Sequence, residues 1–361
     1  LDEDQNLYFG SYLWTEVIGD SMNYFYSVSA EKQINWTFRT KKSLPINAGH
    51  LLGADSAVYF ATQGGYVYSV DLNGKENWSY YIGTNIFSYI MNIDLNGNLY
   101  VCASDSNLYS IKNNGELNWR KKHDNGFWGR SVVISPDGQT LYITGVDSLL
   151  YALNLDGSIK WVFDCGDSPG LPAIDNEGNI YLVAYVDSMG LHSINPNGTL
   201  RWSYNYFHAE RDEHSSPTIS RNGDISFVVG YTNPFLYSQL ITVDYYGKFR
   251  WSYVFEEQLE EIRQPLICDY NGTIYCGSRW GYYFYAISSE GNLYWKYALD
   301  DYAVDNSVAI GSDGTLYIGT HKSSFDPNQK RTLIAIKDTG ITNVNSENKS
   351  SEYQLHQNYP N

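Results

Sequence analysis

Residues 97–119 read GNLYVCASDSNLYSIKNNGELNW, and most of the chain is built from units like this one. Short aliphatic and aromatic runs alternate with small polar residues, and an Asn-Gly dipeptide marks a tight turn between them. This pattern predicts β-hairpins rather than helices, because the apolar residues do not recur at helical spacing. The unit ends on Trp119, and the positions of tryptophan show how the unit recurs.

Seven of the ten tryptophans follow one another at intervals of 42, 41, 42, 41, 49 and 44 residues. A period of roughly forty residues is typical of propeller blades or of helical arrays, and the hairpin pattern excludes the arrays. A single four-stranded sheet cannot bury both of its faces, so we expect each tryptophan to fill the gap between two stacked sheets. These structural, blade-docking tryptophans are Trp36, Trp78, Trp119, Trp161, Trp202, Trp251 and Trp295.

Four strands, named A to D, are predicted in each unit. Strand B carries an aliphatic-Tyr pair such as Leu99-Tyr100 in seven units, with Ile225-Ser226 in the remaining place, and strand C also occurs eight times. We therefore predict an all-β fold, an eight-bladed β-propeller of four-stranded antiparallel blades, with seven blades as the alternative. Strand A of the first blade is not recognised in the sequence, so we expect either the C-terminal segment or a strand upstream of Leu1 to complete the ring. Ile341 to Val344 is the candidate for strand D of the last blade.

Loop length separates the two ends of the predicted blades. The A–B and C–D turns, at the end we call the bottom, are tight glycine turns, whereas the long connections fall at the other end, the top. Long loops on a rigid scaffold are where binding usually resides. The thirteen bottom-turn glycines are Gly74, Gly97, Gly115, Gly138, Gly157, Gly178, Gly198, Gly223, Gly247, Gly272, Gly291, Gly314 and Gly340.

Three tryptophans on predicted top loops, Trp14, Trp128 and Trp280, stand outside the repeat, and Trp128 and Trp280 are candidate ligand-binding residues. The flat apolar face of an indole can stack on a sugar ring or a partner side chain. Packing over the core beneath the loop is the alternative. Another candidate, His208, shares a top loop with Arg211 and His214, and these are residue types that polysaccharide lyases use to move a proton.

Arg130, His214, Arg263 and Asn306 stand where D–A loops enter strand A, at the predicted mouth of a central channel. Such a ring of donors would suit a carboxylate or a sulfate, and we add Arg130, Arg263 and His214 to the candidate ligand-binding residues. The alternative is that both arginines pair with surplus acids. An acidic run at residues 256–261 leaves calcium possible, but its spacing matches no calcium loop and no metal site is predicted.

Charge and cysteine content exclude several classes of protein. With 40 acidic against 24 basic side chains the net charge is −16, which would repel nucleic acid. No run of about 18 apolar residues indicates a transmembrane segment. The four cysteines lack the spacing of a zinc site. Cys268 and Cys276 flank a predicted hairpin turn, where buried free thiols are the preferred interpretation and a disulfide is the alternative.

The segment SVDLNGKENW at residues 69–78 is close to the tryptophan-docking motif of the PQQ-like repeat. The units resemble that repeat as it occurs in quinoprotein dehydrogenases and in the periplasmic lipoprotein of the outer-membrane barrel-assembly machinery. The resemblance spans residues 1–340 and implies one propeller domain. The sequence lacks the adjacent cysteine pair that many quinoprotein dehydrogenases place over the quinone, and their calcium set and catalytic acid are not recognised in it. Neither PQQ nor another cofactor is therefore expected, and no catalytic residue is predicted.

Residues 341–361 are predicted to form a polar linker that leads into YQLHQNYPN at residues 353–361. This ending resembles the start of the C-terminal sorting domain used by type IX secretion. The resemblance implies an extracellular location, or the outer cell surface of a Gram-negative-type bacterium, with the periplasm as the alternative.

Together these features predict a secreted or cell-surface, non-catalytic propeller that binds a glycan or a protein through its top loops. The alternative is an extracellular, lyase-like enzyme that acts on polysaccharides. A periplasmic assembly scaffold and a quinoprotein dehydrogenase are the less favoured hypotheses.

Overall fold

The computed structural model describes residues 1–10, 23–31, 33–41, 46, 49–86, 91–122, 132–145, 147–166, 170–186, 188–206, 216–231, 237–255, 262, 266–278, 282–299, 302–304, 308–322, 332–337 and 352–355. Regular elements among these residues are all β-strands, and they form eight sheets in chain order. Each sheet corresponds to one sequence unit, so we number the blades 1 to 8. Within the described residues, no helix is long and apolar enough to cross a membrane.

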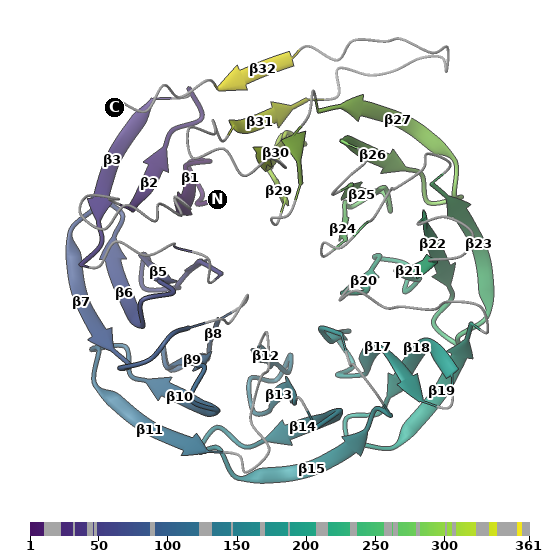
Figure 1. Cartoon of the computed structure of the whole chain (residues 1–361), viewed down its shortest axis with the longest axis horizontal. Coiled ribbons are helices and arrows are strands. Elements are labelled where there is room, and N and C mark those ends of the chain that lie inside the picture. The colour runs from purple at the N-terminus through teal and green to yellow at the C-terminus, as the bar shows by residue number, and fades with distance from the viewer. Residues whose placement is uncertain are drawn as a thin grey trace. The chain divides into compact units, whose positions relative to one another are not determined.

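Blades 1 to 4 contain strands β1 to β15 (Figure 1). Blade 1 has β1 (Leu7–Gly10), β2 (Tyr24–Val28) and β3 (Ile34–Arg39). Blade 2 has β4 (Leu51–Leu52), β5 (Ala57–Ala61), β6 (Tyr66–Asp71) and β7 (Glu76–Tyr81). Blade 3 has β8 (Asn92–Ile93), β9 (Leu99–Cys102), β10 (Asn107–Ile111) and β11 (Leu117–Lys122). Blade 4 has β12 (Val132–Ile134), β13 (Leu141–Thr144), β14 (Leu149–Leu153) and β15 (Ile159–Asp164).

Blades 5 to 8 contain the remaining strands. Blade 5 has β16 (Ala173–Ile174), β17 (Ile180–Val186), β18 (Ser188–Ile194) and β19 (Leu200–Asn205). Blade 6 has β20 (Thr218–Ile219), β21 (Ile225–Tyr231), β22 (Tyr237–Val243) and β23 (Phe249–Val254). Blade 7 has β24 (Ile267–Cys268), β25 (Ile274–Gly277), β26 (Tyr283–Ile287) and β27 (Leu293–Ala298). Blade 8 has β28 (Tyr302–Ala303), β29 (Val308–Ile310), β30 (Leu316–Lys322), β31 (Thr332–Ile336) and β32 (Glu352–Leu355).

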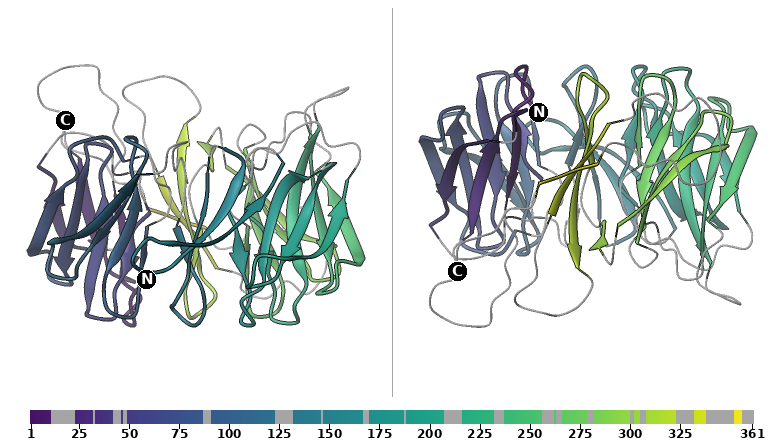
Figure 2. Two further views of the ribbon diagram at one scale, coloured as in Figure 1. Left: turned by 90° about the horizontal axis from the view of Figure 1, so that it is seen from below. Right: turned by 90° about the horizontal axis from the view of Figure 1, so that it is seen from above.

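The predicted fold class, an eight-bladed β-propeller of antiparallel four-stranded blades, is confirmed. Strands within each blade pair antiparallel in the order A, B, C, D, which places the A–B and C–D turns at one end of the sheet and the B–C connection at the other (Figure 2). Blade 1 begins at strand B among the described residues, as predicted. In blade 6, β21 and β22 pair as far as Tyr231 opposite Tyr237.

The last strand of blade 8 is not where the sequence analysis placed it. Strand D is β32, whose Leu355 pairs with Leu333 of β31, whereas Ile341 to Val344 lie outside the described residues. Residues 352–355 alternate polar and apolar residues as the other D strands do, so the segment suits a half-buried strand despite its distance along the chain. The strand therefore uses three residues of the stretch that resembles a sorting domain.

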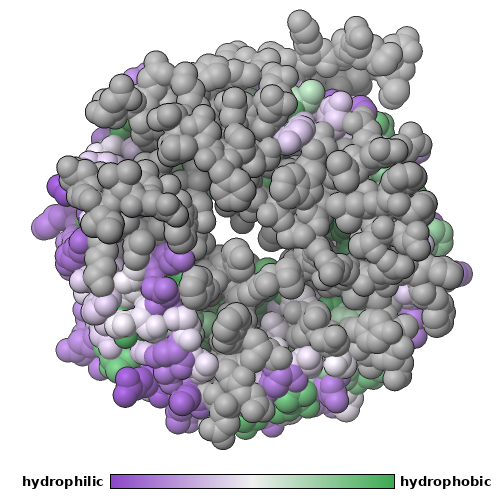
Figure 3. Space-filling model, in the orientation of Figure 1, coloured by the Kyte–Doolittle hydropathy of each residue, from purple (hydrophilic) through white to green (hydrophobic). Residues whose placement is uncertain are grey.

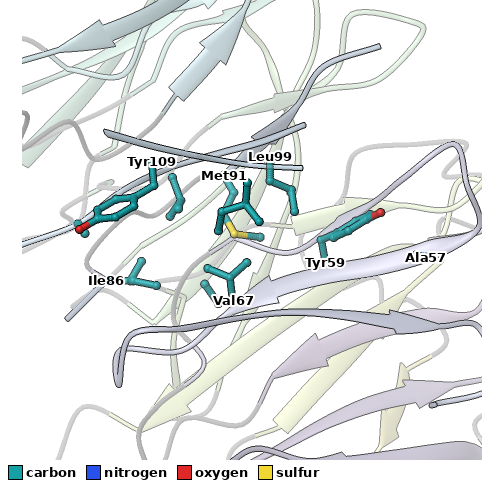
Figure 4. Packing of buried hydrophobic residues seen from close by; sticks show 11 residues of the cluster. Ala57, Tyr59, Val67, Ile86, Met91, Leu99 and Tyr109 are labelled. Atoms are coloured by element: carbon teal, nitrogen blue, oxygen red, sulfur yellow. The ribbon is translucent and has the colours of Figure 1, made fainter. Parts of the chain in front are cut away.

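Two compact units divide the described chain, and each has its own apolar core. Blades 1 to 4 make up the first unit, which spans Leu1–Pro172 together with Asn176–Gly178 and Pro196–Thr199; the rest forms the second unit. In the first unit, Met91 lies between Val67 and Leu99 in a cluster between blades 2 and 3 (Figure 4). On the face viewed in Figure 3, apolar residues lie among polar ones over the strands of this unit.

The indole N–H of the repeat tryptophan joins one blade to the next. Trp36 Nε1 donates a hydrogen bond to the carbonyl of Leu72 at 2.8 Å, and Trp78 Nε1 donates to that of Asn113 at 2.7 Å. Each accepting carbonyl lies in the C–D turn of the following blade. The further bonds run from Trp119 to Leu155, from Trp161 to Pro196, from Trp202 to Tyr245 and from Trp251 to Ser289.

Glycine in the receiving turn makes room for the indole. Gly115 has a φ of +85°, and a Cβ atom there would lie 2.7 Å from Cγ of Trp78. A side chain at this position would therefore be strained by the positive φ. It would also clash with the indole ring, which could move aside only at a cost in free energy. Gly74, Gly198, Gly247 and Gly291 face the indole of the preceding blade in the same way.

In blades 2, 3, 5 and 7 the strand B tyrosine connects the tryptophan of its own blade to an aspartate of the A–B turn. In blade 3 the ring of Tyr100 packs against Trp119 with centroids 5.9 Å apart, and its hydroxyl donates to Asp94 Oδ2 at 2.9 Å. Asp94 Oδ1 accepts backbone N–H groups of Asn96 and Asn98, which fixes the turn. The aliphatic-Tyr pair therefore marks strand B because the tyrosine spans from the turn to the blade interface.

We expect Gly115→Ala to destabilise the protein by about 2–4 kcal/mol, since it combines backbone strain with a clash against Trp78. Gly83→Ala is the matched control in the same unit. Its φ is +94° but a Cβ atom would meet nothing within 4 Å, so it should cost only the strain, about 1 kcal/mol. Urea denaturation measures both values. An equal loss of unfolding free energy in the two variants would contradict the role of the Gly115 turn in accommodating the indole of Trp78.

Candidate functional site

The six ligand-binding residues predicted from the sequence lie outside the residues that the structure describes. The same holds for Trp14, for Asn306 and for the acidic run at residues 256–261. Their contribution to binding therefore stays a prediction. The six residues are Trp128, Arg130, His208, His214, Arg263 and Trp280.

Ser238 of β22 fixes both ends of the loop at residues 256–261. The backbone N–H of Phe255 donates to its carbonyl at 3.1 Å, and that of Ile262 donates to its Oγ at 3.1 Å. Phe255 and Ile262 are also 1 % and 4 % exposed, packed in the core of blades 6 and 7. Phe255 and Ile262, the described residues on either side of the acidic run, are therefore anchored.

Ser278 fixes the turn that carries Trp280 in a similar way. The N–H of Ser278 donates to the carbonyl of Tyr283 at 2.8 Å, and the N–H of Tyr283 returns a bond to Ser278 Oγ at 3.0 Å. Tyr282 adopts a φ of 59°, and its carbonyl accepts the N–H of Leu299 from the end of strand D. The top connection of blade 7 is therefore held at its base by backbone and hydroxyl groups.

The four cysteines are free, and those at Cys102 and Cys165 are buried. Desolvation raises the pKa of the thiols of Cys102, Cys165 and Cys268 to about 12. These thiols are therefore neutral at physiological pH, and a neutral thiol is a poor nucleophile and metal ligand. Among the described residues, no group of three or more His, Cys, Asp and Glu side chains could hold a metal ion.

Two arginine–tyrosine stacks lie in the bottom turns of the second unit. The first stack puts the guanidinium carbon of Arg201, from β19, 4.4 Å from the ring centre of Tyr245 in blade 6. Arg201 Nη1 also donates to Ser193 Oγ at 2.9 Å and to the Tyr181 hydroxyl at 3.3 Å. The Tyr245 hydroxyl accepts from Asn179 at 3.0 Å. This stack is occupied by the protein's own groups and is structural.

The second stack pairs Arg221, in the A–B turn of blade 6, with Tyr270, in the A–B turn of blade 7. The guanidinium carbon lies 4.2 Å from the ring centre, an effective cation–π distance. Tyr270 is 72 % exposed. Within the described part of the chain, neither the Arg221 N–H groups nor the Tyr270 hydroxyl has a hydrogen-bond or ion-pair partner. This stack therefore presents a planar cation and an aromatic ring to the solvent.

A further aromatic ring and a further cation stand in the C–D turn of blade 6. Tyr246 is 78 % exposed and packs edge-on against Tyr245, with centroids 5.4 Å apart. Lys248 follows in the same turn and is exposed. We name the residues Arg221, Tyr246, Lys248 and Tyr270 the Arg–Tyr surface.

Sequence reasoning missed this surface because it treated the bottom turns as glycine hairpins without further function. The signal present was the replacement of polar central turn residues by aromatic ones. Blade 3 has Asn113-Asn114 where blade 6 has Tyr245-Tyr246. Exposed aromatic and arginine side chains are the residue types enriched in protein interfaces.

Comparison with known proteins supports the fold. No family model matches the chain. Among curated proteins, a lupanine 17-hydroxylase (cytochrome c) of a Pseudomonas species is 31% identical over 71 residues, which are 19% of this chain and 10% of that protein. The chain thus matches only about a tenth of that relative's length. Among solved structures, BamB from Moraxella catarrhalis has a TM-score of 0.62 and 15% identity, over 83% of this chain and 86% of that one.

The fold and these similarities define a class of protein. The chain is an eight-bladed β-propeller, and BamB is a structural neighbour of it. The likeness to BamB, at this level of identity, concerns the fold alone.

We expect the thiols of Cys102 and Cys165 to resist Ellman's reagent in the folded protein at mildly alkaline pH. The raised pKa keeps these thiols protonated and burial keeps the reagent away. All four thiols should react once urea unfolds the chain, without prior reduction. Mass spectrometry of the modified peptides assigns each cysteine, and rapid reaction of either buried thiol in the native state would contradict the expectation.

Proposed function

We propose that this chain is an exported, non-catalytic propeller that binds a protein partner through the loops at the top of its blades. The observation that carries the proposal is the anchoring of those loops by Ser238 and Ser278. Loops that begin and end at buried, hydrogen-bonded residues can present side chains in a fixed arrangement at little entropic cost.

The residues that such loops would present are the types that dominate protein interfaces. Arg263 directly follows the buried Ile262, and Trp280 lies in the turn between Ser278 and Tyr282. Tryptophan and arginine are enriched among residues that contribute most to binding. The resemblance of the repeat to that of a barrel-assembly lipoprotein supports a scaffold role.

Export is supported by the resemblance of residues 353–361 to a type IX sorting domain. We infer that the protein acts outside the cell or on its outer surface, and a periplasmic location is the alternative. Fractionation of the producing cells tests the location, since recovery of the full chain in the cytoplasm alone would contradict export.

Replacing Trp128 and Trp280 by alanine and Arg130 and Arg263 by glutamine should weaken binding of the partner by about tenfold or more, because each removes an anchor of the type that dominates interfaces. Binding is measured against fractionated envelope proteins and a glycan array. Leu95→Ala, on an exposed bottom turn of blade 3, is the control and should bind as the native chain does.

Three outcomes would contradict the proposal in different ways. Unchanged binding in the fourfold variant would rule out the top loops as the binding surface. Loss of binding to glycans alone would identify a glycan rather than a protein partner. Release of products from an acidic polysaccharide would show that the propeller is an enzyme.

A further inference from the structure

We propose that the Arg–Tyr surface binds an acidic segment of a protein partner, at the end of the blades opposite to the predicted top loops. Arg221 and Lys248 would meet carboxylates of that segment, while Tyr246 and Tyr270 would contact its apolar side chains. The proposal does not depend on the function of the top loops.

The two arginine–tyrosine stacks provide an internal comparison. Both place a guanidinium group over a ring from the next blade, at 4.4 Å for Arg201 and 4.2 Å for Arg221. Arg201 donates to Ser193 and Tyr181, and it is partly buried. Arg221 is exposed, and within the described chain it has the stack as its one interaction. A stack of this kind holds a guanidinium in a fixed plane with its donors available, which favours bidentate contact with a carboxylate.

The neighbouring acids do not neutralise Arg221. Asp224 and Asp244 are both near Arg250, at 3.5 and 4.0 Å. Asp269 Oδ1 accepts the N–H groups of Asn271 and Thr273 and fixes its own turn. In a chain with a net charge of −16, Arg221 and Lys248 are therefore two cations on one surface whose charge is left for a partner.

The exposure of the rings favours a protein partner over a small ligand. Small-molecule sites are concave and bury most of the ligand surface, whereas Tyr246 and Tyr270 are 78 % and 72 % exposed on hairpin turns. Exposed aromatic rings beside an arginine are typical of protein interfaces. Asp244 and Asp269 accept backbone N–H groups within the turns that carry these rings, which fixes the turns and lowers the entropic cost of binding.

Fluorescence anisotropy with a labelled, end-capped peptide of alternating Glu and Phe tests the proposal, with a Gln and Phe peptide as the neutral probe. We expect the acidic peptide to bind the native chain about tenfold more tightly than the neutral one, and added salt to reduce this preference. Arg221→Gln should abolish most of the preference. Arg221→Lys should retain part of it, because it keeps the charge but loses the planar donors.

Tyr270→Ala should weaken binding of both peptides, since it removes the apolar contact and the support of Arg221. Lys112→Gln is the matched control, because it changes the net charge by the same amount on an exposed turn of blade 3. Thermal unfolding should be the same for all these variants, as the substituted side chains are exposed.

The proposal is overturned if neither peptide binds, or if Arg221→Gln and Lys112→Gln reduce the preference equally. It is also overturned if an oligosaccharide of hexuronic acid binds this surface in an Arg221-dependent way and the acidic peptide does not. That result would assign the surface to a glycan.

Discussion

The bond from an indole N–H to a backbone carbonyl of the next blade is the interaction on which the rest of the structure depends. A four-stranded sheet has two faces and can bury neither alone, so the blades must be held in contact. The six tryptophans from Trp36 to Trp251 at the repeat position each supply apolar bulk for the gap and one directional bond to the next blade. The glycine in the receiving turn has to lack a side chain, because the ring occupies the space where Cβ would lie.

This arrangement gives the two ends of a blade different freedom to vary. The C–D turns must accept an indole, so their length and their glycine are constrained, and only the outward-pointing central residues can change. Tyr246 and Lys248 occupy such positions in blade 6. The top connections receive no indole and can lengthen, provided that residues such as Ser238 and Ser278 hold their ends. Side chains at the bottom are therefore presented on short turns, whereas the connections at the top can be longer.

Most of the fold could be predicted from the sequence because its signals are local. The tryptophan interval, the aliphatic-Tyr pair and the glycine turns each lie within one unit, and every strand B and C was placed correctly. Strand D of blade 8 could not be predicted, because β32 pairs with β31 across a long connection that has no hairpin-turn sequence. The Arg–Tyr surface was missed for a related reason. The sequence does not show whether the guanidinium of Arg201 or of Arg221 has hydrogen-bond partners, and only their contacts separate the two.

Each docking tryptophan and the glycine turn that receives it belong to different sequence repeats. This affects how the number of blades can change in evolution. A gene segment that encodes one whole sequence repeat carries a tryptophan that docks on the following blade. It also carries a glycine turn that receives the tryptophan of the preceding blade. Duplication of that segment would insert a blade already compatible with both neighbours, and its deletion would leave two compatible blades. Blade number can then vary by recombination in whole units, without any new interface having to arise first.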